Sequence, residues 1–132
     1  MYILDTNVLI AVMKEDRKVI AHISRLPEQA EIFTTIINAA ELYYGAYKSQ
    51  RIQANLEKIK QLLADLTVLE LGMREVETFG EIKSILERNG EIVPDNDLFI
   101  ASIALRKDAI LVTNNTRHFL RVEGLTLEDW SI

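Results

Sequence analysis

The stretch that decides the fold is the N-terminal run Met1-Tyr2-Ile3-Leu4-Asp5-Thr6-Asn7-Val8-Leu9-Ile10. An apolar segment stops at Asp5, and a second apolar segment begins at Val8, a pattern typical of a buried strand that turns into a helix. Ligands of open parallel sheets bind at the carboxyl ends of the strands. Asp5 is therefore expected where such folds carry out chemistry, although an acid at this position serves equally well as a helix N-cap.

Short apolar strands alternate with amphipathic helices along the rest of the chain. The pattern predicts strands at 2–4, 31–35, 67–71 and 109–113, an edge strand at 125–127, and helices at 6–14, 16–26, 36–47, 52–66, 73–89 and 98–107. Such alternation implies parallel βαβ units with helices on both faces of one sheet. We predict the α/β class, as a three-layer α/β/α sandwich with a mostly parallel sheet of four to five strands. Residues 1–132 form one domain.

Composition restricts where the protein works. The chain has 132 residues and no cysteine, so it contains neither a disulfide framework nor a thiolate zinc site. No apolar run reaches transmembrane length, and the N-terminus lacks the basic start and cleavage site of a signal peptide. We therefore expect a protein of the reducing cytoplasm that has no contact with membranes.

The net charge limits the binding partners. Twenty acids against fifteen bases give a formal net charge of −5. Nucleic-acid-binding proteins are usually basic on their binding face. An RNA substrate would therefore require a local basic patch, or metal ions that reverse the sign of an acidic pocket.

Several polar residues fall near the carboxyl ends of the predicted strands. The set comprises Asp5, Glu41, Asp95, Asp97, Thr113 and Asn115. Each has an ordinary interpretation when taken alone: Glu41 as a solvated helix residue, Asp97 as a partner of the helix dipole and Asn115 as a turn residue. Carboxylates that converge on one sheet edge, however, repel one another unless a cation joins them. Oxygen ligands without cysteine favour Mg²⁺ or Mn²⁺.

Four segments of the chain, taken in order, resemble the PIN domain family, and within it the VapC-type toxins of bacterial toxin–antitoxin pairs. They are Leu4-Asp5-Thr6-Asn7, Asn38-Ala39-Ala40-Glu41-Leu42-Tyr43-Tyr44-Gly45-Ala46, Asp97-Leu98-Phe99-Ile100-Ala101-Ser102 and Leu111-Val112-Thr113-Asn114-Asn115. The tail from Phe119 to Trp130 is similar to the same toxins. The resemblance covers the whole chain, and the four segments together are far more specific than any one of them.

The resemblance implies a metal-dependent endoribonuclease that uses Mg²⁺ or Mn²⁺ and pairs with a VapB-like antitoxin. Asp5, Glu41 and Asp97 match the three principal acids of the family, which bind the metal and carry catalysis. Asn7 and Thr113 match positions that orient an acid or a metal-bound water.

Asp95 is expected to assist Asp97 from beside the metal site. Many PIN domains carry a further acid in the loop after Thr113, where this chain offers only Asn115 and His118. This departure leaves tight binding of a second metal ion in question. His118 itself is expected to be a loop residue of minor importance for activity.

Candidate contacts to the substrate are basic. Arg117 and Arg121 flank the loop nearest the predicted pocket, and arginine binds phosphate through two parallel hydrogen bonds. The weaker candidates are Lys14, Arg17, Lys48 and Arg51. The resemblance points to structured RNA such as tRNA, but no residue encodes that choice.

Tyr43, Tyr44 and Tyr47 crowd one helix, and not all three can face the core. Exposed aromatic residues at helical spacing suit an interface, so we expect a homodimer in addition to the complex with the antitoxin. Internal packing against the next helix is the alternative.

The sequence is also compatible with other functions. The chain is alternatively a PIN-type nuclease of RNA processing, or a PIN-like scaffold that binds RNA or a partner without cleaving. A ribonuclease that uses a histidine pair would need His22 and His118 in one pocket. A phosphatase with an aspartyl nucleophile would need an acid at position 7, which is Asn7.

Overall fold

The computed structural model describes residues 1–132 and contains one parallel sheet of five strands in the order β3–β2–β1–β4–β5. The strands are β1 (Tyr2–Leu4), β2 (Ile32–Thr35), β3 (Thr67–Leu69), β4 (Ile110–Val112) and β5 (Thr126–Glu128). From β1 the chain proceeds to β2 and β3 on one side, and then crosses to β4 on the other side. The direction of winding thus changes between β1 and β4, which is where open α/β sheets bind their ligands.

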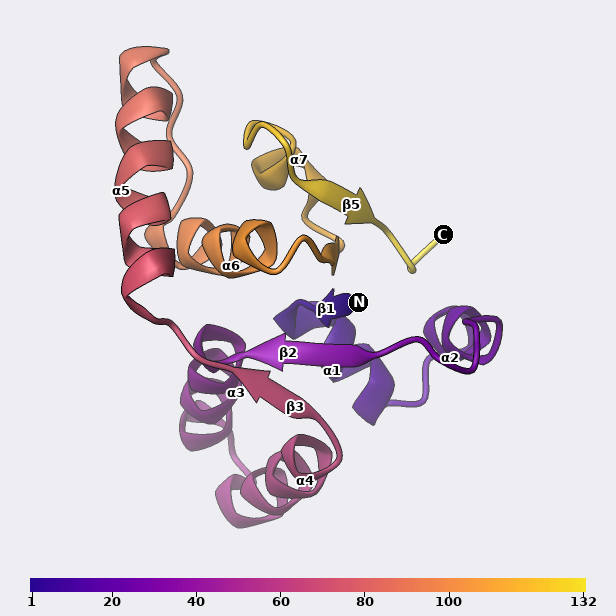
Figure 1. Ribbon diagram of the computed structural model, residues 1–132. Helices are drawn as coiled ribbons and strands as arrows, with labels where there is room; N and C mark the ends of the chain where they lie inside the picture. The colour runs from indigo at the N-terminus through magenta and orange to yellow at the C-terminus, as the bar shows by residue number, and fades with distance from the viewer.

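Helices cover both faces of the sheet, as Figure 1 shows. The helices are α1 (Thr6–Met13), α2 (Arg17–Ser24), α3 (Ile36–Lys48), α4 (Ile52–Ala64), α5 (Met73–Arg88), α6 (Asp95–Arg106) and α7 (Thr116–Phe119). The first four pack on one face, and α5, α6 and α7 pack on the other. The predicted three-layer α/β/α sandwich is confirmed. No helix is both long enough and apolar enough to span a membrane.

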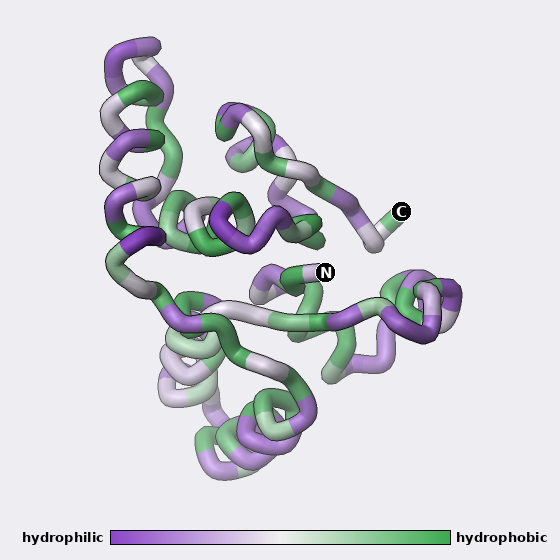
Figure 2. The backbone as a smooth tube through the Cα atoms, viewed as in Figure 1, coloured by the Kyte–Doolittle hydropathy of each residue, from purple (hydrophilic) through white to green (hydrophobic).

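Two hydrophobic clusters, one on each face, hold the layers together. Neighbouring residues of a strand point to opposite faces of the sheet. Ile3 and Leu111 accordingly join the cluster under α5–α7, whereas Leu4 and Val112 join the cluster under α1–α4. Figure 2 shows hydrophobic and hydrophilic residues alternating along α4 and α5, as expected of helices that have one face on the core and the other in solvent.

The start of α6 differs from the sequence prediction. The helix begins at Asp95, directly after Pro94, rather than at Leu98. Both Asp95 and Asp97 therefore lie in its first turn, where negative charge interacts favourably with the helix dipole. The rest of the helix is nearly all buried, as its apolar composition predicted.

The segment after β4 also differs. We predicted a loop for residues 114–119, but residues 116–119 form the short helix α7. Phe119 is fully buried in the cluster under α6, and this burial ties the turn to the core. His118, which precedes Phe119, thus lies on a helix rather than in a free loop.

Candidate active site

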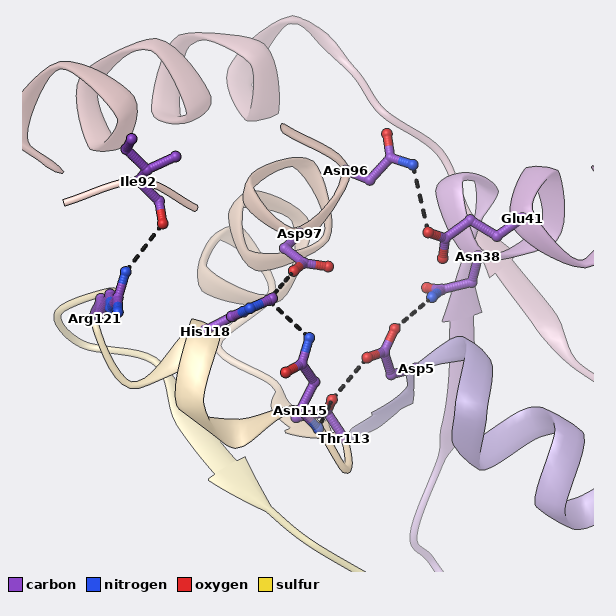
Figure 3. A network of polar contacts seen from close by, with 10 residues as sticks. All are labelled: Asp5, Asn38, Glu41, Ile92, Asn96, Asp97, Thr113, Asn115, His118 and Arg121. Atoms are coloured by element: carbon purple, nitrogen blue, oxygen red, sulfur yellow. Dashed lines mark hydrogen bonds and ion pairs between the residues drawn. The ribbon is translucent and has the colours of Figure 1, made fainter. Parts of the chain in front are cut away.

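Asp5 ends β1 and forms the centre of a buried polar network (Figure 3). Its Oδ1 accepts hydrogen bonds from the backbone nitrogen of Thr6 (2.9 Å) and from Nδ2 of Asn38 (2.9 Å), and its Oδ2 accepts one from Oγ1 of Thr113 (2.7 Å). Only 7% of the residue is exposed. Asp5 is therefore both the N-cap of α1 and a carboxylate that donors from three different elements hold in place.

Asn38, in the first turn of α3, is a site residue that sequence reasoning missed. Thr35 donates from Oγ1 to the amide oxygen of Asn38 (2.7 Å), which leaves the amide nitrogen to donate to Asp5 and to Oγ1 of Thr6 (2.9 Å). Asn38 is fully buried, and no polar atom of its side chain lacks a partner. The sequence did contain a signal for Asn38. The pattern Thr35-x-x-Asn38 is a helix cap directly after a strand, and Asn38 shares a helix face with the acid Glu41 one turn later.

Glu41 lies one turn further along α3 and is linked to the same network. Oγ1 of Thr6 donates to Oε1 of Glu41, and Nδ2 of Asn96 donates to Oε2 (3.4 Å). Because Thr6 also accepts from Asn38, a chain of hydrogen bonds runs from Asp5 to Glu41. Glu41 thus connects α1 with the first turn of α6.

Asp97 faces the site from the first turn of α6, and its oxygen Oδ2 lies 2.9 Å from Nδ1 of His118. Burial raises the pKa of Asp97 above its ordinary value, while the hydrogen bond with His118 acts in the opposite direction. The charge of Asp5 raises this pKa further, so the two acids are close enough to repel each other. Asp97 therefore carries a carboxylate whose negative charge is poorly compensated by the protein.

His118 and Asn115 complete the network on the side of α7. Nδ2 of Asn115 lies 2.8 Å from Nδ1 of His118, and the backbone nitrogen of Asn115 donates to Oγ1 of Thr113 (2.9 Å). A path of polar contacts therefore joins Asp5 to Asp97 through these three residues (Figure 3). His118 is the second site residue that sequence reasoning underestimated.

Some predicted supporting residues do not join the acids. Asp95 is largely exposed and forms an ion pair with Lys83 on α5 (3.0 Å). Asn7 is exposed, and no hydrogen bond connects its side chain with an acid. Asp95 therefore faces α5 rather than assisting Asp97, and Thr6 and Asn38 hold the acids where Asn7 was expected to do so.

The two candidate arginines differ in their surroundings. Arg121 donates to the backbone oxygen of Ile92 (3.0 Å) and lies 3.9 Å from Glu91, so it is bound to the segment before α6 (Figure 3). Arg117 is exposed on α7 and forms no ion pair. Of the two, only Arg117 is free to meet a substrate without breaking an existing contact.

The two histidines lie in different environments. His22 stacks on Trp130 with ring centroids 5.7 Å apart and an interplanar angle of 5°, and its Nε2 lies 3.2 Å from the backbone oxygen of Ile132. His118 contacts Asp97 and Asn115 instead. A ribonuclease mechanism that uses this histidine pair is therefore excluded.

The donor set fits a hard divalent cation, although the side chains are not arranged as a finished ligand shell. No group of three acids, histidines or cysteines converges closely enough to hold an ion. The Thr6 hydroxyl lies between the Asp5 network and Glu41, and His118 covers one oxygen of Asp97. Asp5 and Asp97 supply mutually repelling carboxylates, the oxygen ligands that Mg²⁺ and Mn²⁺ prefer.

The tyrosines of α3 divide between core and surface. Tyr44 and Tyr47 are 67% and 64% exposed, whereas Tyr43 packs against the cluster under α1–α4. The expectation that not all three face the core is confirmed. The homodimer stays a prediction, which sedimentation at micromolar concentration would test.

Comparison with known proteins identifies relatives over nearly the whole chain. Residues 2–125 match the family model of the PIN domain. Ribonuclease VapC2 of Haemophilus influenzae is 39% identical over 130 residues, which cover 98% of this chain and 97% of the relative. The tRNA(fMet)-specific endonuclease VapC of Shigella flexneri is 36% identical over 130 residues, with 98% of both chains covered.

Solved structures agree with the sequence relatives. In the crystal structure of VapBC2 from Rickettsia felis bound to a DNA fragment from their promoter, one chain superposes with a TM-score of 0.91 at 34% identity, with 98% of both chains covered. The structure of VapBC-1 from nontypeable Haemophilus influenzae gives a TM-score of 0.91 at 31% identity, covering 99% of this chain and 98% of that chain. The likeness therefore extends over the entire sandwich.

Proposed function

This chain belongs to the PIN domain family, and from that premise we propose that it is a metal-dependent endoribonuclease, the toxin of a VapBC-type toxin–antitoxin pair. The observation that carries the proposal is the polar network at the switch point of the sheet. It links Asp5 after β1, Glu41 on α3 and Asp97 on α6, three acids far apart in the sequence. The similarity to named ribonucleases supports the same reaction.

The chain's own residues hold and orient the acids. Asp5 is fixed by Asn38 and Thr113, His118 contacts Asp97, and Thr6 with Asn96 holds Glu41. In this proposal Asp5 and Asp97 hold Mg²⁺ or Mn²⁺ and Glu41 completes the site. An ion bound there lowers the pKa of a bound water and stabilises negative charge on the phosphate.

No side chain needs to act as a nucleophile, which agrees with the absence of cysteine and of any hydrogen-bonded serine–histidine pair. Water is then the attacking group in an in-line displacement at phosphorus. The RNA 2′-hydroxyl takes no part in the reaction. The products are an RNA with a 5′-phosphate and one with a 3′-hydroxyl.

Structured RNA such as tRNA is the proposed substrate, and a VapB-like antitoxin is the proposed partner. A relative is named as specific for tRNA(fMet), and neighbouring structures are VapBC complexes. An RNA-processing nuclease would cleave without such a partner. Co-expression with the reading frame next to the gene, followed by purification of a stable complex that does not cleave, separates the toxin from a processing enzyme.

We expect the purified protein to cleave RNA in Mg²⁺ or Mn²⁺ and to lose this activity in excess EDTA, because the acids cannot promote the reaction without a cation. Gel analysis of a labelled tRNA, combined with end-group analysis, measures both effects. Unchanged cleavage in EDTA, or a 2′,3′-cyclic phosphate at the product end, contradicts the proposed chemistry. RNA binding without cleavage under any metal condition would instead indicate a PIN-like scaffold.

His118→Ala is expected to lower cleavage by about 10- to 100-fold, the usual effect of removing the partner of a metal-binding carboxylate. The contact between His118 and Asp97 reverses the expectation from sequence that His118 matters little. His118→Asn keeps a donor near the position of Nδ1 and should recover most of the activity.

A second readout distinguishes positioning from a general structural role of His118. The Mn²⁺ concentration that gives half of the maximal rise in Tm should increase in His118→Ala and return towards the wild-type value in His118→Asn. Equal activity and equal Mn²⁺ response in all three proteins would show that His118 does not position Asp97.

A further inference from the structure

A groove of about 310 Å³ opens beside Glu41, between α1, α3 and α4. Thr6 and Glu41, which belong to the polar network of the site, also line this groove. A molecule that occupies the groove therefore lies next to the proposed point of cleavage. On the basis of the proposed function, we infer that the groove binds one nucleotide of the RNA strand, adjacent to the cleaved bond.

The floor of the groove suits the flat, apolar faces of a base and its ribose. It is formed by Ile10, Met13, Leu42 and Ile59. Leu42 and Ile59 are buried members of the cluster under α1–α4, so the floor is part of the rigid core. The volume lies at the lower end of the range of about 300–1,000 Å³ that is typical of small-molecule sites, which fits a single nucleotide and not a duplex.

The rim of the groove supplies the positive charge that RNA requires. Lys14 and Lys58 line it, and neither forms an ion pair. Lys83 and Arg121, on the side of α5 and α6, each lie against a carboxylate and have little charge to offer. Arg117 is unpaired on α7 and would meet the strand on the far side of the acids.

Charge complementarity favours RNA over a segment of a partner protein as the occupant. The whole chain carries a net charge of −5, so a polyanion binds only where unpaired cations gather. Lys14 and Lys58 bring two such cations to the groove that Glu41 also lines. A phosphate next to the cleaved bond would bridge these lysines, while its base rests on the apolar floor.

The first experiment removes the charge of the rim. The double variant Lys14→Gln/Lys58→Gln is compared with Lys60→Gln/Lys107→Gln, which makes the same change at exposed positions on α4 and at the end of α6, outside the groove. The probe is a labelled single-stranded RNA twelve nucleotides long, whose binding is followed by fluorescence anisotropy in EDTA over a series of KCl concentrations. Cleavage of the same RNA in Mg²⁺ gives KM and kcat.

The groove variant should reduce the magnitude of the slope of log affinity against log salt by about 0.7, because the two lysines share one phosphate and each phosphate contact on a single strand contributes about 0.7. Its KM should rise about tenfold while kcat changes by less than about twofold, since binding is lost and the acids are untouched. The control variant should keep the wild-type slope and the wild-type KM.

A second variant blocks the groove without changing its charge. Gly45 lines the groove, and a β-carbon added there meets no atom within 4 Å. Gly45→Phe should fill the space and raise KM as the lysine variant does, whereas Gly45→Ala should behave as the wild type. Both substitutions replace a glycine inside a helix, so the folded protein should persist.

The outcomes separate this inference from the proposed function. If wild-type protein cleaves RNA while the lysine and Gly45→Phe variants keep the wild-type KM and salt slope, the inference is overturned and the groove is left for a segment of a partner protein. If no RNA is cleaved but both groove variants weaken RNA binding, the nuclease proposal fails and the groove assignment stands. Failure of the wild type to bind the RNA at all also overturns the inference.

Discussion

Asp5→Asn is expected to lower RNA cleavage by more than about 100-fold, a larger effect than that of losing a partner of a metal-binding residue. The substitution keeps the size and shape of the side chain but removes the charge that would hold a divalent ion. Asp5 is also the most firmly fixed of the three acids, because Asn38, Thr113 and the backbone of Thr6 all donate to it. The measurement is the cleavage rate of a labelled RNA at saturating Mg²⁺.

The matched control is Asp95→Asn. It makes the same chemical change in the first turn of α6, but Asp95 is largely exposed and paired with Lys83. Exposed ion pairs contribute little to stability because water screens them, so both stability and cleavage should stay near the wild-type values. Wild-type activity in Asp5→Asn, or equal losses in the two variants, would refute the role given to Asp5.

The structure also changes the expected effect of Asp5→Asn on stability. Relief of the repulsion between carboxylates, which the sequence led us to expect, would by itself make Asp5→Asn a stabilising change. The carboxylate of Asp5, however, accepts three hydrogen bonds from fixed donors, and an amide cannot accept them all. An unsatisfied buried donor costs roughly 1–3 kcal/mol, so we expect a loss, measurable as a lower urea midpoint.

The layers of the fold could be predicted because they depend on local patterns. The abrupt stop of the apolar run at Asp5 indicated both the end of β1 and the start of α1. The nearly continuous apolar residues of α6 predicted a buried helix, and Leu98 and Ile100 are indeed fully covered. Alternation of strands and helices then allows few arrangements other than a parallel sheet.

The side-chain network of the site could not be predicted in the same way. Its hydrogen bonds join residues far apart in the sequence: Asn38 with Asp5, Thr6 with Glu41, and His118 with Asp97. Periodicity indicates which face of an element is buried, but not which donor on that face reaches which acceptor on another element.

The distinction between Asp95 and Asp97 depended on one helix boundary. With the helix assumed to begin at Leu98, both acids lay in a turn, and only the resemblance to the PIN domain family favoured Asp97 over Asp95. Because α6 begins at Asp95, the two residues are separated by about 200° around the helix axis, given 3.6 residues per turn. Asp97 then faces the site while Asp95 faces α5, where Lys83 lies.

Asp97→Asn is the variant expected to gain stability while losing activity. Burial and the charge of Asp5 raise the pKa of Asp97 in the folded protein. A carboxyl group with a raised folded-state pKa favours folding in its protonated form, and it loses that contribution as the pH rises through the folded-state pKa. At neutral pH the charged Asp97 therefore destabilises the wild type. An asparagine removes this charge and can still accept a hydrogen bond from His118.

In urea titrations without divalent ions, Asp97→Asn should have a higher midpoint than the wild type at pH 7, with an unchanged m-value. The difference should shrink as the pH falls towards the ordinary aspartate pKa of about 3.9, because the wild-type carboxyl group becomes protonated. A difference that does not vary with pH, or a lower midpoint at pH 7, would contradict this account of Asp97.

The same variant links the stability of the fold to the proposed metal ion. Mn²⁺ should raise the Tm of the wild type, because a cation bound by the folded state compensates the repulsion between Asp5 and Asp97. Mn²⁺ should raise the Tm of Asp97→Asn much less. RNA cleavage by this variant should fall by more than about 100-fold, which exceeds the loss expected when only a partner of a metal ligand is removed.

Asp95→Asn is the control, because it leaves Asp5 and Asp97 in place; its Tm should respond to Mn²⁺ as the wild type does. An equal rise in Tm for Asp97→Asn and the wild type would show that the ion binds elsewhere. The repulsion that lowers stability in this pocket would then have no role in cleavage.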